Sequence, residues 1–114
     1  MQTVIETNAY IAAAKDAGMS ADEMADTATY IAENPTVGDI MPGCGGARKV
    51  RVAKPGKGKS GGYRVITYFA GETVPIFLLT VFGKNEKVNL SKKERNALAD
   101  LTKRLADTLT KART

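Results

Sequence analysis

Histidine is absent from this 114-residue chain, and cysteine occurs once, as Cys44. Without histidine, proton transfer near neutral pH has to use Lys, Arg, Tyr, Asp or Glu. A single cysteine excludes a disulfide within the chain, and the lack of a cysteine–histidine cluster leaves zinc without its usual ligands. The sequence therefore predicts no metal and no other cofactor.

Long apolar runs are also missing. No stretch of about 18 residues is apolar enough to cross a bilayer, so we expect no membrane-spanning helix. The first residues, MQTVIETNAY, contain no apolar run flanked by cations and do not resemble a signal peptide. We therefore expect a cytoplasmic protein. Its 43% hydrophobic and 25% charged residues are typical of soluble proteins, and its length fits one domain over residues 1–114.

Acidic residues are missing between Asp39 and Glu72, although this stretch is rich in cations. The cations are Arg48, Lys49, Arg51, Lys54, Lys57, Lys59 and Arg64. The first 37 residues have the opposite balance, with one lysine against six acids. The net charge of +5 is thus unevenly distributed. A surface carrying charge of one sign attracts a phosphate chain, so this stretch is the place to look for function.

The apolar periodicity predicts an α+β fold, a small antiparallel β-sheet with an N-terminal helical hairpin and a C-terminal helix, in the order β-α-α-β-β-β-α. We expect strands over residues 2–6, 47–53, 62–70 and 74–82, and helices over residues 8–17, 20–33 and from 91 onward. Capping boxes, Ser20 with Glu23 and Ser91 with Glu94, mark two helix starts. Residues 76–82 are apolar on both faces and predict a central strand covered on both sides.

The basic loop before the second long strand has two interpretations. Its GKGKS segment is not a P-loop, because Ala53 replaces the first glycine and a strand follows instead of a helix. The lysines could simply make a hairpin soluble. Arg64, however, shares a strand face with Ile66 and Tyr68 beside this loop, and a guanidinium there favours a phosphate clamp. Lys84, after the apolar strand, is either part of a solvated turn or a further functional cation.

Three segments, PGCGGARKVRVA, GKGKSGGYRVITYF and FLLTVFGKNEKVNLSKKE, resemble in order and spacing the HigB-like branch of the RelE/ParE toxin superfamily of type II toxin–antitoxin modules. The segment MSADEMADTATYIAENPTVGD resembles the second helix of that branch and the loop after it. The resemblance covers nearly the whole chain. It implies a RelE-like fold and ribosome-dependent cleavage of mRNA. It also implies restraint by a cognate antitoxin of helix-turn-helix type, with operator DNA contacted only through that antitoxin.

The resemblance also implies roles for individual residues. The RNA 2′-OH would be the nucleophile, Lys57 or Lys59 the base, Arg64 the phosphate-stabilising group, and Lys84 a second clamp or proton donor. RNA binding would fall to Arg48, Lys49, Arg51, Lys54, Tyr63, Tyr68 and Asn85, with Tyr63 or Tyr68 stacking on a base. Some RelE-type nucleases use a tyrosine or histidine near the C-terminus. The tail ADTLTKART has neither, so the proton donor stays open.

Two other functions are compatible with the sequence. One is the ParE-type activity of the same superfamily, in which the toxin poisons DNA gyrase by binding it and needs no catalytic residue. The other is a nucleic-acid-binding module without catalysis. The cluster of cations around Arg64 favours the nuclease over the gyrase poison.

Overall fold

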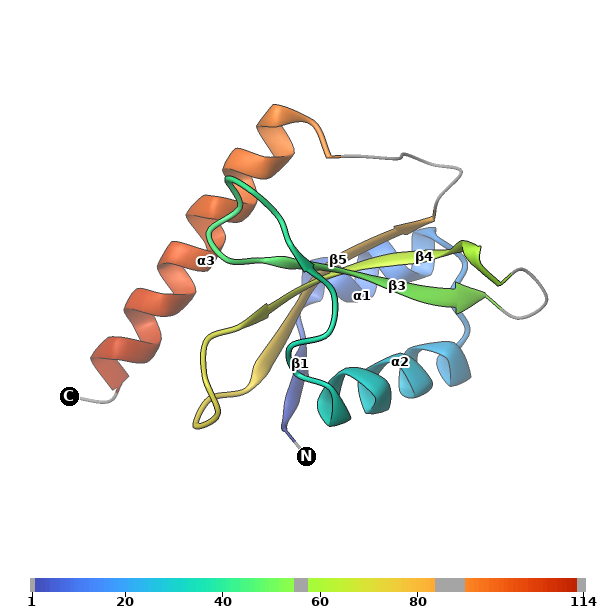
Figure 1. Cartoon of the computed structure of the whole chain (residues 1–114), viewed down its shortest axis with the longest axis horizontal. Coiled ribbons are helices and arrows are strands. Elements are labelled where there is room, and N and C mark those ends of the chain that lie inside the picture. Colours follow the sequence, from blue (N-terminus) through green and yellow to red (C-terminus); the bar gives the residue numbers. More distant parts are fainter. Residues whose placement is uncertain (1, 55–57, 84–89, 113–114) are drawn as a thin grey trace.

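The computed structural model describes residues 2–54, 58–83 and 90–112, and for residues 54, 58–61 and 110–112 it describes the backbone only. The helices are α1 (Asn8–Asp16), α2 (Ala21–Glu33) and α3 (Lys92–Ala112). The strands are β1 (Val4–Glu6), β2 (Asp39–Ile40), β3 (Arg48–Lys54), β4 (Gly58–Phe69) and β5 (Ile76–Gly83). Figure 1 shows the sheet in the middle of the molecule, with α3 well separated from the α1–α2 hairpin.

The strands form one five-stranded sheet in the order β1-β5-β4-β3-β2. The pairs β2–β3, β3–β4 and β4–β5 are antiparallel, whereas β1 runs parallel to β5. The predicted fold class and the predicted sequence of three long antiparallel strands are confirmed. The first strand was predicted over residues 2–6, but its parallel pairing with β5 was not, and the two-residue β2 was not predicted. β2 matters here, because it borders the site described below.

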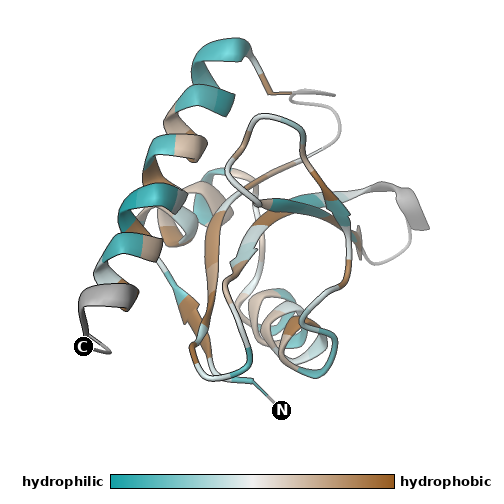
Figure 2. Ribbon diagram, turned by 60° about the vertical axis from the view of Figure 1, so that its left-hand side comes forward, coloured by the Kyte–Doolittle hydropathy of each residue, from teal (hydrophilic) through white to brown (hydrophobic). Residues whose placement is uncertain are grey.

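Each face of the sheet has its own hydrophobic core. The α1–α2 hairpin packs on one face, where Tyr10, Ile31 and Leu78 are fully buried. On the other face Leu79 and Phe82 of β5 pack with Leu98 of α3. Strand β5 is therefore covered on both sides, as its two-faced apolar pattern predicted. Figure 2 shows this strand layer between the helices.

Both predicted capping boxes are present. The Ser20 backbone N–H donates to Glu23 Oε1 at 2.8 Å, and the Glu23 N–H donates to Ser20 Oγ at 3.1 Å. Ser91 and Glu94 repeat the pair at 2.9 and 3.1 Å. These reciprocal bonds satisfy N–H groups that a helix start leaves without partners. The second box fixes the first turn of α3 beside the sheet.

The glycine-rich loop before β3 packs closely against α3. Cys44 is fully buried, and Thr102 Oγ1 donates to Ala99 O at 3.0 Å and reaches Cys44 O at 3.5 Å. Gly45 has φ +67°, and a Cβ atom there would overlap Thr102 Oγ1. Burial raises the pKa of the Cys44 thiol, partly opposed by Arg95. The close approach of loop and helix therefore requires glycine at position 45.

Candidate nucleic-acid interface

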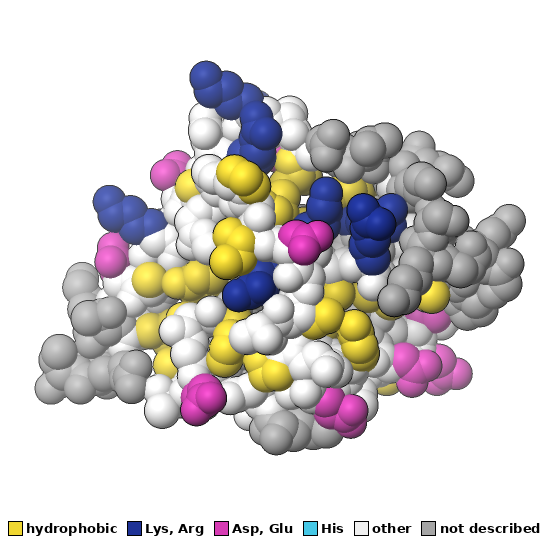
Figure 3. Space-filling model, viewed as in Figure 1, with side chains coloured by type: hydrophobic (Ala, Val, Ile, Leu, Met, Phe, Trp, Pro, Cys, Tyr) yellow, Lys and Arg dark blue, Asp and Glu magenta, His cyan; other side chains and the backbone are white. Residues whose placement is uncertain are grey.

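A pocket of about 420 Å³ opens on the α3 side of the sheet. We call it the cationic pocket. Its lining comes from β2 and the loop after it, from β3, from the end of β5 and from the start of α3, and comprises Asp39, Ile40, Met41, Pro42, Lys49, Arg51, Phe82, Leu90 and Arg95. Three cations, Lys49, Arg51 and Arg95, thus line the pocket together with Phe82 and Leu90, two buried apolar side chains. Figure 3 shows lysine and arginine side chains gathered over β3 beside hydrophobic ones.

Strand alternation places these cations. Val50 packs into the core under the α1–α2 hairpin, so its neighbours Lys49 and Arg51 project to the α3 side. The alternation of Val50 and Val52 with Lys49 and Arg51 in the sequence already predicts this division of β3 into an apolar and a charged face.

Two arginines lie directly opposite each other on this face. Arg51 pairs with Arg64 across β3–β4, and Arg64 pairs with Phe82 across β4–β5. Arg64 is only 8% exposed. Like charges at opposite positions of a sheet repel each other and destabilise the fold. An anionic ligand bound over this row would offset that repulsion, so the geometry is suited to phosphate.

Two residues of the pocket were missed by sequence reasoning. Arg95 lies in the first turn of α3, where its N–H donates to Ser91 O at 2.9 Å. It precedes Leu98 by three residues and so shares the sheet-facing side of the helix, a signal that the sequence did contain. Asp39 pairs in register with Lys49. Nothing in the sequence distinguished Asp39 from other loop carboxylates.

A sequence model described as the RelE toxin of the RelE/RelB toxin–antitoxin system matches residues 2–113. The chain belongs to the RelE toxin family. A RelE-family toxin acts within a toxin–antitoxin module, so an antitoxin is its partner. The match confirms the predicted superfamily, while the HigB-like branch stays a prediction. None of the helices in the described part of this RelE-family toxin is long and apolar enough to cross a membrane.

Arg48 and Tyr63, two residues predicted to bind RNA, lie away from the cationic pocket of this toxin. The Arg48 guanidinium donates from Nη1 to Thr36 O at 3.1 Å and to Gly38 O at 3.3 Å. It therefore holds the loop between α2 and β2. Tyr63 is 2% exposed under the hairpin, and its hydroxyl donates to Glu23 Oε2 at 3.3 Å. Burial, together with Glu23, raises the pKa of Tyr63.

Both placements bear on the predicted roles. A ring buried under the hairpin presents little of its face to a nucleobase, and the Arg48 guanidinium contacts backbone carbonyls through Nη1. The stacking role of Tyr63 and the RNA-binding role of Arg48 stay predictions. Tyr68 does lie on the α3 side, but it is half-buried against the core there and does not line the cationic pocket.

The remaining predicted site residues of the toxin stay predictions. Lys57, Lys84 and Asn85 lie outside the described residues. Lys54 belongs to β3 and Lys59 to β4, and only their backbones are described. Of the sequence-predicted residues, the structure thus brings together Lys49, Arg51 and Arg64.

Proposed function

We propose that this RelE-family toxin cleaves mRNA on the ribosome and binds the scissile phosphate in the cationic pocket. The row formed by Arg51 and Arg64 is the observation that supports this most strongly. Arg51 lines the pocket together with Lys49 and Arg95, and Arg64 lies opposite Arg51 across β3–β4, so cationic side chains gather in one region of the sheet. Such a cluster is adapted to an anion with several oxygens, and a phosphate group has that character.

The chemistry needs no cofactor. The 2′-oxygen of the RNA forms a bond to the neighbouring phosphorus, and the bond from phosphorus to the 5′-oxygen of the next nucleotide breaks. The products carry a 2′,3′-cyclic phosphate and a 5′-hydroxyl. Negative charge grows on the non-bridging oxygens during this step, and Arg51 and Arg64 would stabilise it. Lys49 and Arg95 would hold the phosphates on either side.

Two protons have to move, one from the 2′-OH and one to the leaving oxygen. The family resemblance makes Lys57 or Lys59 the base that accepts the first proton, and Lys84 either a second phosphate clamp or the donor of the second proton. Asp39 is a further candidate base, because its carboxylate lines the same pocket. The ribosome would orient the RNA, so modest acid–base groups on the toxin would be enough. Lys54, Tyr68 and Asn85 are also proposed to contact RNA.

Induction in a bacterial host, followed by mapping of new mRNA 5′ ends, tests this function. Wild-type chain should arrest growth and create cuts inside translated frames. Arg51→Ala should reduce cutting by about ten- to a hundredfold, because it removes charged hydrogen bonds of about 1.5–3 kcal/mol. Lys103→Ala, an exposed cation on α3 that does not line the pocket, is the matched control and should cut like wild type.

Other outcomes would contradict the proposal. Growth arrest without new 5′ ends would favour gyrase poisoning. RNA binding without arrest and without cuts would favour a non-catalytic module. Unchanged cutting by Arg51→Ala would remove the cationic pocket from the mechanism.

A further inference from the structure

A second pocket, of about 360 Å³, lies on the other side of β3, between that strand and α2. We call it the α2–β3 groove. Its volume falls at the lower end of the range for pockets that hold small molecules, roughly 300–1,000 Å³. One wall belongs to α2 and the other to the sheet, and the side chains that matter here are Glu23, Asp26, Thr27, Tyr30, Val52 and Tyr63.

The face of α2 that borders the groove is polar, which is unusual for a helix packed on a sheet. Glu23, Asp26, Thr27 and Tyr30 follow the spacing i, i+3, i+4 and i+7, so they share one side of the helix. A stripe with this spacing normally carries the apolar residues that a helix buries. In α2 the contacts with the core come from a neighbouring stripe that includes Ile31. The polar stripe therefore faces the groove with its acceptor groups.

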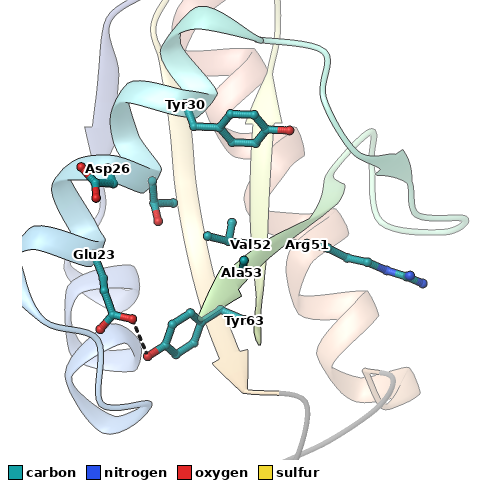
Figure 4. Close-up of a pocket in the computed structure, with 8 residues that line it drawn as sticks. Glu23, Asp26, Tyr30, Arg51, Val52, Ala53 and Tyr63 are labelled. Atoms are coloured by element: carbon teal, nitrogen blue, oxygen red, sulfur yellow. Dashed lines mark hydrogen bonds between the residues drawn. The ribbon is translucent and has the colours of Figure 1, made fainter. Parts of the chain in front are cut away.

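The Glu23 carboxylate is held in place from two sides. The Ser20 N–H donates to Oε1 at 2.8 Å, and the Tyr63 hydroxyl donates to Oε2 at 3.3 Å, the bond drawn as a dashed line in Figure 4. Each carboxylate oxygen can accept two hydrogen bonds, so Glu23 keeps further acceptor capacity. Asp26, which is exposed, adds a second carboxylate about one helical turn further along. Together the two acids favour a bound cation.

The Thr27 side chain gives independent evidence for a ligand. It lines the groove and is only 2% exposed, and its hydroxyl oxygen has no hydrogen-bond partner in the described part of the chain. A buried hydroxyl without a partner costs about 1–3 kcal/mol. An N–H group of a ligand that donates to Thr27 Oγ1 would offset this cost. The ligand therefore has to carry hydrogen-bond donors as well as positive charge.

Tyr30 and Val52 determine what joins the charged groups of the ligand. Tyr30 is 42% exposed, and Val52 is half-buried on the sheet side of the groove. Methylene groups can bury against both side chains, and the face of the tyrosine ring attracts a cation. Arg51 also borders the groove, but Figure 4 shows its side chain pointing away. The groove thus fits amines joined by a short aliphatic chain.

We propose that the α2–β3 groove binds a linear aliphatic polyamine. One ammonium group donates to the Glu23 carboxylate and to Thr27 Oγ1, the methylene chain packs on Val52, and the next amine lies over the Tyr30 ring beside Asp26. The whole chain carries a net charge of +5, so the local acids and not the overall charge attract this ligand. The site lies on the opposite side of β3 from the cationic pocket and is independent of the phosphate that we propose to bind there.

Isothermal titration calorimetry of the folded wild-type chain with spermidine tests the proposal. Spermidine should bind at a single site with a Kd below about 1 mM at about 0.1 M salt. Two compounds separate the features that are recognised. A neutral aliphatic diol of the same length lacks the charges, and a lysine derivative blocked at its backbone amine and carboxyl presents one ammonium group as a protein would. Each should bind at least about tenfold more weakly than spermidine.

Two results of this titration would overturn the proposal. One is the lack of saturable spermidine binding. The other is binding of either comparison compound as tight as that of spermidine, because the diol would then show that charge is irrelevant and the lysine derivative that a protein side chain is the better occupant.

Variants locate the site. Glu23→Gln combined with Asp26→Asn should weaken spermidine by about tenfold, while the amide at position 23 keeps the capping box. Thr27→Val removes only the hydroxyl and should weaken it by about three- to tenfold, whereas Thr27→Ser should bind like wild type. Asp22→Asn, an exposed acid on the same helix that does not line the groove, is the matched control and should also bind like wild type. Unchanged affinity in the double variant or in Thr27→Val would refute the assigned contacts.

NMR spectra give a readout that a merely structural effect would not move. Spermidine should shift the amide resonances of Thr27, Tyr30 and Val52. Shifts confined to residues near Asp16 and Glu94, which line a third pocket of about 210 Å³, would place the ligand elsewhere and overturn the proposal. None of these measurements uses RNA, so they stand or fall independently of the proposed nuclease activity.

Discussion

Gly45→Ala tests the contact between the glycine-rich loop and α3. Gly45 has φ +67°, and its Cβ would overlap Thr102 Oγ1 and lie 3.3 Å from the Ala99 Cα. Both sides of this contact continue into walls of the cationic pocket, through Pro42 and Arg95. The substitution thus perturbs the frame of the site without touching its charges.

Two costs add at this position. An alanine held in the left-handed region is destabilised by about 1–2 kcal/mol, and overpacking a buried contact adds about 1–3 kcal/mol. We therefore expect Gly45→Ala to lower the free energy of unfolding by about 2–5 kcal/mol. Gly43 is a matched control, because it has φ +75° and a Cβ added there would meet nothing within 4 Å. Gly43→Ala should lower the free energy of unfolding only by the cost of the left-handed backbone, about 1–2 kcal/mol.

Urea unfolding of wild type, Gly45→Ala and Gly43→Ala gives the loss in free energy of unfolding for each variant. Thr102→Ala should partly rescue Gly45→Ala, because it removes the overlapping hydroxyl, and the two changes should therefore be non-additive. If Gly45→Ala were no less stable than Gly43→Ala, the packing of this loop on α3 would be refuted.

Three further predictions concern side chains beneath and beside the sheet. Burial and Glu6 raise the pKa of Tyr10 to about 12. The contribution of Tyr10 to the free energy of unfolding is full below about pH 10 and falls by about 2–3 kcal/mol as the pH rises toward 12. Tyr10→Phe should remove this part of the pH dependence, as urea unfolding at about pH 9 and 11.5 would show. The Thr27 hydroxyl oxygen is buried without a hydrogen-bond partner in the described part of the chain, so Thr27→Val should raise the free energy of unfolding by about 1 kcal/mol. Arg48→Ala should lower the free energy of unfolding by about 1–2 kcal/mol and leave RNA affinity unchanged. Lys49→Ala should lower RNA affinity and leave the free energy of unfolding unchanged. Unfolding and RNA-binding titrations of both variants would show this.

Local chemistry was predicted well from the sequence because it acts over a few residues. The capping boxes at Ser20 and Ser91 and the two-faced pattern of β5 needed only spacing and residue type. The division of β3 into an apolar and a charged face followed from alternation alone. That division correctly placed Lys49 and Arg51, two of the three cations that line the pocket, on the same face.

Long-range pairing could not be predicted in the same way. β1 is a strand because Val4 pairs in parallel with Ile76, far along the chain, and β2 is a strand through two pairs with β3. The family resemblance implied that Tyr63 or Tyr68 stacks on an RNA base. The register of β4 instead decides on which side of the sheet the Tyr63 side chain lies, and it directs this side chain under the α1–α2 hairpin.

Arg95 shows what was available in the sequence but not used. Its spacing from Leu98 indicates that it lies over the sheet, yet its contribution to a pocket depends on where the C-terminal helix docks. The contact of Thr102 with the loop at Gly45 fixes that docking, and neither residue marks it in the sequence.

Cleavage of a defined mRNA on programmed ribosomes, with and without 2′-deoxy nucleotides at the cut codon, tests the central claim most directly. The 2′-oxygen is the proposed nucleophile, so the all-ribose message should yield fragments ending in a 2′,3′-cyclic phosphate and a 5′-hydroxyl. The 2′-deoxy message should stay intact, and Arg51→Ala should slow cutting of the all-ribose message. Cutting of the 2′-deoxy message at the wild-type rate, or no cutting of either message, would contradict the account.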